Sequence, residues 1–145
     1  MINFYYETDI RFDDQDLIIK WISSVIMSEN KTEGEISFIF CDDEYLLKIN
    51  QDFLNHDTYT DIISFDDSLG DQLNGDIFIS AERVKENAIK FKVLEEEEMR
   101  RVIIHGILHF CGYKDKSKEE QQAMRSKEDE KLLMFHVEQL YVVKK

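Results

Sequence analysis

The chain has few cysteines and no long apolar run. Only Cys41 and Cys111 are present among 145 residues, too few for the disulfide framework of a small secreted protein. Both stand among apolar residues, which favours free, buried thiols in a reducing compartment. No apolar stretch approaches the roughly 20 residues that span a bilayer. Met1 to Phe12 contain no basic segment followed by an apolar one. We therefore expect a cytoplasmic protein with no secretory signal and no membrane partner.

Proline is absent, whereas an average chain of this length contains about seven prolines. No Gly/Ser-rich linker, repeat or low-complexity segment divides the sequence. A chain of this size can bury roughly 68–70% of the surface that its unfolded form exposes, which is enough for an ordinary core. The sequence therefore predicts one domain over residues 1–145.

Basic residues are also scarce, with 18 Lys and Arg against 31 Asp and Glu and a net charge of −13. Direct capture of a bare nucleic-acid backbone normally requires a basic surface. A role on nucleic acid would therefore need a local basic patch or a protein partner that supplies positive charge. An acidic protein docks readily on basic partners, of which ribosomal proteins are one class.

The spacing of apolar residues predicts an α+β fold with a four-stranded mixed sheet and about five helices. Strands are expected at 2–6, 35–41, 61–65 and 76–80, helices at 13–25, 42–53, 81–93, 95–111 and 117–140, and loops at 30–34 and 69–74. Helices separate the first three strands, which predicts parallel strands with helical crossovers, and the short link between the last two predicts an antiparallel pair. Helix 95–111 is almost entirely apolar at its centre and should be the central buried helix.

Residues 105–115 of this helix and the following loop read H-x-x-x-H-x-x-G-x-x-D. His105 and His109 are four residues apart and therefore lie on one helix face. Gly112 can take the left-handed conformation that ends a helix and turns the chain back, so that Asp115 can approach the two imidazoles. Three donors that leave a fourth position open are typical of a catalytic metal site rather than a structural one.

The same spacing occurs in the long zincin pattern H-E-x-x-H-x-x-G-x-x-H. This chain has Gly106 in place of the Glu that acts as base, and Asp115 in place of the third His. A metal site without that Glu can still polarise a substrate oxygen, but a peptidase activity is disfavoured. Cys111 should lie on another face of the helix. Two His and one carboxylate suit zinc, and also iron or nickel; the alternative is that both His are ordinary core side chains.

The sequence HGILHFCGYKDK resembles the signature H-G-x-L-H-x-x-G-Y-D-H of the YbeY family, bacterial rRNA maturation factors described as metal-dependent endoribonucleases. KINQDFLNHDTYTDIISFDD and LNGDIFIS resemble a second family block, L-N-x-x-Y-R-x-x-D-x-x-T-D-V-L-S-F followed by G-D-I-x-I-S. The resemblance covers residues 36–133. It implies a zincin-like metal site on the central helix, one zinc ion held by His105, His109 and Asp115, and a single metal-dependent hydrolase domain over 1–145.

The chain departs from the family pattern at three positions. Asp115 replaces the third His, and Lys114 replaces the Asp before it. Leu54 replaces an Arg that, as the resemblance implies, contacts phosphate or assists catalysis, and Leu can do neither. His56 and Lys48 are candidates to supply the missing positive charge.

Other residues match the second block. Thr60, Asp61 and Ser64 match T-D-x-x-S-F, and with His56 they are candidates to support catalysis from a groove wall beside the metal. Hydrogen bonding within a turn and at a strand edge is the equally open alternative for them. Gly75 and Asp76 match G-D, where a tight turn that fixes the next strand is expected.

The resemblance implies a single-strand-specific endoribonuclease that acts in ribosomal RNA processing, at the 3′ end of 16S rRNA, and in ribosome quality control. Ribosomal RNA, the small ribosomal subunit and basic ribosomal proteins are then the expected partners. The nucleophile could be a water or the ribose hydroxyl of the substrate. Two alternatives are a zinc peptidase and a ribosome-assembly factor that binds without cutting and uses the metal structurally.

Overall fold

The computed structural model describes residues 1–55 and 59–144, and the side chains of these residues up to 137. Its elements are β1 (Ile2–Tyr6), α1 (Gln15–Ser28), β2 (Thr32–Cys41), α2 (Asp43–Leu54), β3 (Ile62–Asp66), β4 (Gln72–Ser80), α3 (Ala81–Phe91), α4 (Glu95–Phe110) and α5 (Lys118–Lys144). The predicted α+β class is confirmed over this described part of the chain. No helix within it is long and apolar enough to cross a membrane.

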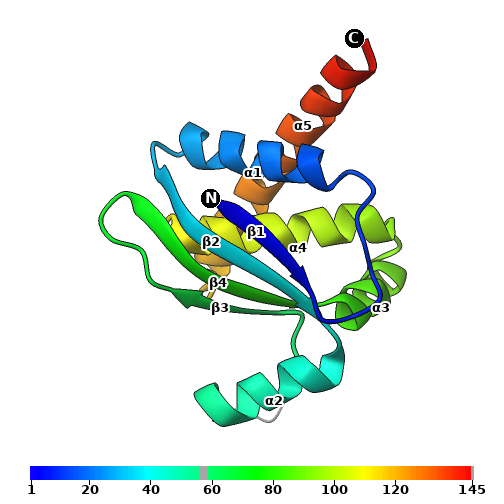
Figure 1. Cartoon of the computed structure of the whole chain (residues 1–145). Coiled ribbons are helices and arrows are strands. Elements are labelled where there is room, and N and C mark those ends of the chain that lie inside the picture. The colour runs from blue at the N-terminus through cyan, green and yellow to red at the C-terminus, as the bar shows by residue number, and fades with distance from the viewer. Residues whose placement is uncertain (56–58, 145) are drawn as a thin grey trace.

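The sheet has the strand order β1-β2-β4-β3 (Figure 1). Strands β1, β2 and β4 are parallel, and β3 is antiparallel to β4. The parallel crossover from β1 to β2 and the antiparallel β3–β4 pair are therefore confirmed. The predicted parallel crossover from β2 to β3 is wrong, because β4 pairs with β2 and β3 runs antiparallel at the edge of the sheet. The antiparallel strand β3 forms one edge of the sheet.

The ends of several elements differ from the sequence prediction. Residues 32–34 and 72–74, expected as loops, extend β2 and β4, because Thr32 pairs with Gln72 and Glu33 with Leu73 across the sheet. Leu73 is fully buried there. Asp14 is the N-cap residue of α1, but its side chain makes no capping hydrogen bond. Helix α5 continues to residue 144, beyond the predicted 140.

The two faces of the sheet carry cores of unequal size. Ile36, Phe38 and Phe40 of β2 point into a large core shared with α1, α4 and α5. The opposite face has a small cluster in which Leu46 of α2 packs on Ile63 of β3. Figure 1 shows α4 behind the sheet and α2 set apart from it, below the β3–β4 edge.

Helix α4 is the central buried helix that the sequence predicts. It packs closely on the sheet at Gly106, where a Cβ atom would lie 3.0 Å from Ile77 Cδ1 and 3.1 Å from Ile62 Cδ1. This contact places the C-terminal half of α4, which carries both histidines of the motif, beside edge strand β3.

Candidate metal centre

The three predicted donors come together at the C-terminal end of α4. The rings of His105 and His109 lie edge to face with their centroids 4.6 Å apart. After α4 the chain turns at Gly112, whose φ of 106° is in the region that favours glycine. Tyr113 N then donates to Leu108 O at 3.1 Å, which closes the helix end. The predicted turn at Gly112 is confirmed.

Asp115 is held between two helix ends. Ser117 and Glu120 form a capping box at the start of α5, with Ser117 N donating to Glu120 Oε1 at 2.9 Å and Glu120 N donating to Ser117 Oγ at 3.1 Å. The end of α4 and the start of α5 therefore fix both sides of the short loop. This loop directs the Asp115 carboxylate back toward the two imidazoles.

The donor distances fit a divalent ion. Asp115 Oδ2 lies 3.2 Å from His105 Nε2 and 3.4 Å from His109 Nε2, and one ligand atom from each residue lies within 4.8 Å of the other two. Tetrahedral bonds of about 2.0–2.1 Å place neighbouring ligand atoms about 3.3–3.4 Å apart. Two imidazole nitrogens and a carboxylate oxygen are thus spaced as ligands of one ion, with room for a fourth.

A residue of α5 orients the first imidazole. Glu128 Oε2 lies 2.6 Å from His105 Nδ1, and Arg101 donates to Glu128 Oε1 at 2.9 Å and to Asp129 Oδ1 at 2.7 Å. Because an ionised Glu128 can only accept, Nδ1 carries a proton, which leaves Nε2 as the ring nitrogen that can ligate an ion beside Asp115. A carboxylate behind a ligating His is a common support of metal sites.

Sequence reasoning missed Glu128 and Arg101. The one available signal concerns Arg101, which lies one turn before His105 on α4. No pattern in the sequence links Arg101 or His105 to Glu128, which lies 23 residues after His105. Only the packing of α5 on α4 brings the three side chains together.

Burial and neighbouring charges shift several pKa values at this site. Burial lowers the pKa of His105, but the hydrogen bond and charge of Glu128 and the charge of Asp115 outweigh it, so that the pKa is raised. Burial raises the pKa of Asp61, against the effect of His105. It also raises that of Glu98, with the charge of Asp61 adding to the effect.

The donors open into a cleft of about 930 Å³ between α4, α5 and the β3 edge. It is lined by Asn50, Leu54, Thr60, Asp61, Ile62, Ile63, Ser64, Asp66, Phe91, Glu98, Arg101, Val102, His105, His109, Phe110, Asp115, Gln121, Met124, Arg125 and Glu128. Three of the predicted supporting residues, Thr60, Asp61 and Ser64, therefore lie in the same cleft as the donors. His56 lies outside the described residues.

The local roles of these residues are mixed. The Thr60 hydroxyl donates to Ile62 O at 3.4 Å, which is the hydrogen bonding within a turn that was the alternative to a catalytic role. Ser64 faces the cleft from β3. Lys48 is absent from the described lining of the cleft.

Neither cysteine belongs to the donor cluster. Burial raises the pKa of Cys111 to about 11 and that of Cys41 to about 12, which makes both thiols poor ligands and poor nucleophiles near neutral pH. Both are free thiols, as expected.

Two glycines have packing roles in and around the cleft. Gly106 faces the sheet so closely that a Glu there, at the position of the zincin base, would have to displace the side chains of Ile77 and Ile62. Gly75 does not form the predicted tight turn. It lies inside β4 with a φ of 152°, and a Cβ atom would come within 2.2 Å of Phe65 O. A close approach of chains therefore explains this glycine.

An α+β domain whose buried helix presents two His toward a loop carboxylate, at the bottom of an open cleft, has the design of a metal-dependent hydrolase. Residues 2–136 match the sequence model of a family described as endoribonuclease YbeY. The chain is 65% identical over 139 residues to the endoribonuclease YbeY of Flavobacterium psychrophilum, covering 96% of this chain and 99% of that protein. It is 49% identical over 142 residues to that of Karelsulcia muelleri, covering 98% and 99%.

The solution structure of TM1509 from Thermotoga maritima superposes with a TM-score of 0.69 at 23% identity, covering 97% of this chain and 93% of that one. At this identity the likeness shows a shared fold. The two sequence comparisons show the family. The chain belongs to the endoribonuclease YbeY family, as the resemblance in its motifs implies.

Proposed function

We propose that this chain is a single metal-dependent hydrolase domain over residues 1–145 that cleaves single-stranded RNA. Its place would be the processing of ribosomal RNA in the cytoplasm, at the 3′ end of 16S rRNA, and ribosome quality control. The observation that carries the proposal is the spacing of the His105, His109 and Asp115 donors in a cleft, in a chain of this family.

The metal would be held by His105 Nε2, His109 Nε2 and an oxygen of Asp115. Zinc suits this donor set best. When bound, a divalent ion supplies a Lewis acid that polarises a phosphoryl oxygen and lowers the pKa of water. Asp115 brings a negative charge where the family has a neutral His, which weakens that Lewis acidity. Glu128 keeps His105 in the tautomer that ligation needs.

The opposite wall of the cleft would orient the RNA. Thr60, Asp61 and Ser64 line it from the segment that leads into β3 and from β3 itself. Gly106 stands at the position of the zincin Glu, so no Glu there can act as base. The nucleophile would be either a water or the ribose hydroxyl of the substrate. We expect slow turnover from a site with one metal and no adjacent base.

The expected partners are ribosomal RNA and the small ribosomal subunit. The net charge of −13 opposes binding of free RNA and favours docking on basic ribosomal proteins. These proteins would hold the substrate strand near the cleft while the metal site acts on it.

A second candidate function is a ribosome-assembly factor that does not cut. Leu54 favours it, because this side chain lies in the cleft wall where the family pattern has Arg. In that case the metal would tie α4 to the loop at Asp115, and its removal would lower stability without changing any rate.

The first test is the metal content of tag-free protein by mass spectrometry, for wild type, Asp115→Ala and Asp115→His. We expect about one equivalent of metal in wild type and Asp115→His and none in Asp115→Ala. An Asp9→Ala variant, at an exposed position, controls for loss of a carboxylate elsewhere. Metal retained in full by Asp115→Ala would refute the ligand assignment.

The second test is cleavage of single-stranded RNA, duplex RNA and an unstructured protein. Thermal unfolding is measured alongside, in the presence and in the absence of a chelator. Cleavage of the single strand alone supports the proposed function. Stabilisation by metal with no cleavage of RNA supports the assembly factor. Cleavage of the protein would support a peptidase.

A further inference from the structure

The cleft needs a positive charge to bind RNA, and its described lining offers few. Asp61, Asp66, Glu98, Asp115 and Glu128 are its acids, and Arg101 and Arg125 are the Arg or Lys side chains found there. Phosphate binding depends on Lys or Arg contacts. One of these two arginines is therefore the candidate for that contact.

Arg101 is already committed to the protein. Its two terminal nitrogens pair with Glu128 and Asp129 at 2.9 and 2.7 Å, and its side chain is only 13% exposed. Removing it from Glu128 would leave a buried carboxylate without its partner, which is costly. Arg101 therefore serves the support of His105 and is not available to a substrate.

Arg125 has the opposite character. It is exposed on α5, and its guanidinium makes no ion pair or hydrogen bond with any residue that the structure describes. Burial raises the pKa of Glu98, and the charge of Arg125 lowers it in part. Its five N–H donors are thus free to meet a ligand in the cleft.

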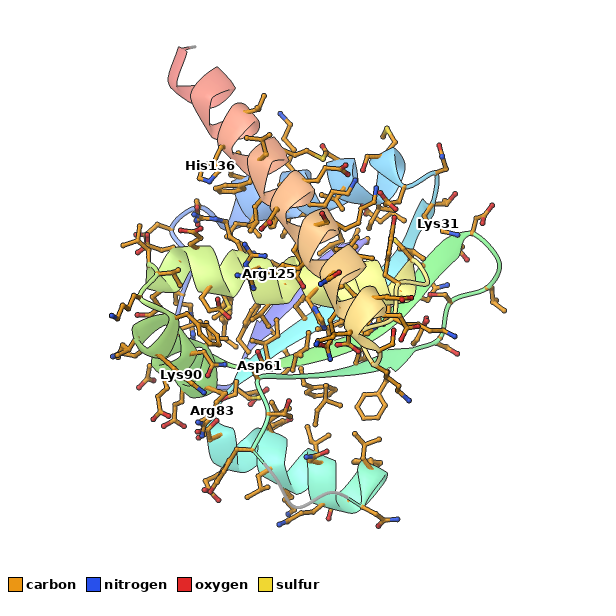
Figure 2. The ribbon with its side chains drawn as sticks, turned by 180° about the vertical axis from the view of Figure 1, so that it is seen from behind. Lys31, Asp61, Arg83, Lys90, Arg125 and His136 are labelled. Carbon is orange, nitrogen blue, oxygen red and sulfur yellow. The ribbon has the colours of Figure 1, made fainter. Side chains whose placement is uncertain are left out.

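Helix α5 holds Arg125 in a defined place relative to the donors. Gln121, Met124, Arg125 and Glu128 form one stripe of this helix, at spacings of three and four residues, and all line the cleft. Met124 is buried, and Glu128 contacts His105. Figure 2 shows Arg125 beside α5, with Asp61 where β3 begins.

We propose that Arg125 binds a phosphate of the RNA strand in the cleft, and so supplies from α5 the positive charge that Leu54 does not supply from α2. This inference rests on the proposed function. Arg is suited to the role because its planar fork matches two phosphate oxygens at once. The strand would then lie between the α5 stripe and the β3 wall, with the metal donors between them.

The test is single-turnover cleavage of a short single-stranded RNA by zinc-loaded protein at several protein concentrations and at salt from 50 to 200 mM. This yields the half-saturating protein concentration, its salt dependence and the maximal rate. The variants are Arg125→Gln, Arg125→Lys and the control Lys20→Gln, which removes one charge from an exposed position of α1 outside the cleft.

For Arg125→Gln we expect the half-saturating concentration to rise about tenfold, as for loss of a charge-assisted hydrogen bond. The log–log salt slope should fall by about 0.7, which is one phosphate contact on a single strand. Arg125→Lys should keep the slope and lose part of the affinity. Lys20→Gln should match wild type, and metal content should be equal in all four proteins.

An unchanged salt slope and less than a twofold change in half-saturation for Arg125→Gln would overturn the proposal, and would leave Arg125 as a counter-charge to Glu98. Loss of affinity in Lys20→Gln to the same extent would also overturn it, because the effect would then come from net charge. Failure of the proposed function looks different, since wild type itself would neither bind nor cleave the RNA.

Discussion

The two walls of the cleft are built from different contacts. On the α4–α5 wall, Arg101, Glu128 and His105 form a chain of charged hydrogen bonds between 2.6 and 2.9 Å. On the α2–β3 wall, the polar side chain of Thr60 bonds only within its own turn, and Leu54 presents an apolar surface. The first wall is therefore preorganised for a metal, whereas the second places Asp61 and Ser64 beside the apolar Leu54.

The cores behind the walls differ in the same sense. The α4–α5 wall stands on the large core that contains Phe38 and Trp21. The α2–β3 wall stands on the small cluster of Cys41, Leu46 and Ile63. Substitutions behind the first wall should affect stability and metal affinity, and those behind the second should have weaker effects. The following variants test this contrast.

Gly106→Glu should have the largest effect. It would restore the zincin base in sequence, but the side chain would be forced against Ile77 and Ile62 of the sheet. We expect a loss of more than about 4 kcal/mol in the free energy of unfolding, from overpacking and a buried unpaired charge. Urea unfolding measures it.

The matched control is Gly70→Asn, in an open turn where a Cβ atom would meet nothing within 4 Å and where φ is 57°. Asn tolerates this conformation, so the cost there should stay below about 1 kcal/mol. A stable Gly106→Glu protein would contradict the close packing of α4 on the sheet.

Phe38→Ala and Phe78→Ala compare the cores with one chemical change on neighbouring strands. Phe38 is fully buried in the large core, and its removal should cost about 3–5 kcal/mol. Phe78 is half-buried on the small cluster, so its removal should cost about half as much. Equal losses in urea unfolding would show that the two faces contribute alike.

Glu128→Ala and Asp129→Ala each remove one partner of Arg101, but only Glu128 also contacts His105. We expect Glu128→Ala to weaken metal binding about 10–100-fold, the usual effect of removing the support of a ligating His. Asp129→Ala should change it little. Competition with a chromophoric chelator measures both, and similar affinities for the two variants would contradict the role of Glu128.

Glu98→Gln should have the smallest effect, and its sign depends on pH. Burial and the charge of Asp61 raise the pKa of Glu98 above its ordinary value of 4.5. The folded wild type therefore holds this proton more tightly than the unfolded chain does. The stability that protonated Glu98 contributes is fully present below pH 4.5 and is lost as pH rises through the folded pKa.

The uncharged Gln does not share this loss. The variant should therefore gain stability relative to wild type as pH rises above 4.5, and the gain should level off once Glu98 is ionised in the folded protein. Unfolding of metal-free protein from pH 4 to 8 measures the difference. A difference that shrinks as pH rises would show that Glu98 is stabilised as an anion.

The sequence by itself determined the features that depend on neighbouring residues. His105 and His109 share a helix face because of their spacing, Gly112 ends the helix, and the capping box that starts at Ser117 begins the next one. These are contacts within a few residues, and the alternation of apolar residues likewise gave the strands and the central helix. The donor set was therefore predictable with no knowledge of the packing.

Tertiary structure decided the features that join distant segments. Glu128 meets His105 and Arg101 because α5 crosses α4, and residues 32–34 are strand because they pair with residues 72–74. The residues next to these positions in the sequence give no sign of either contact. The helices and the donor spacing follow from short-range geometry, whereas the partners of each donor follow from how the whole chain buries its apolar surface.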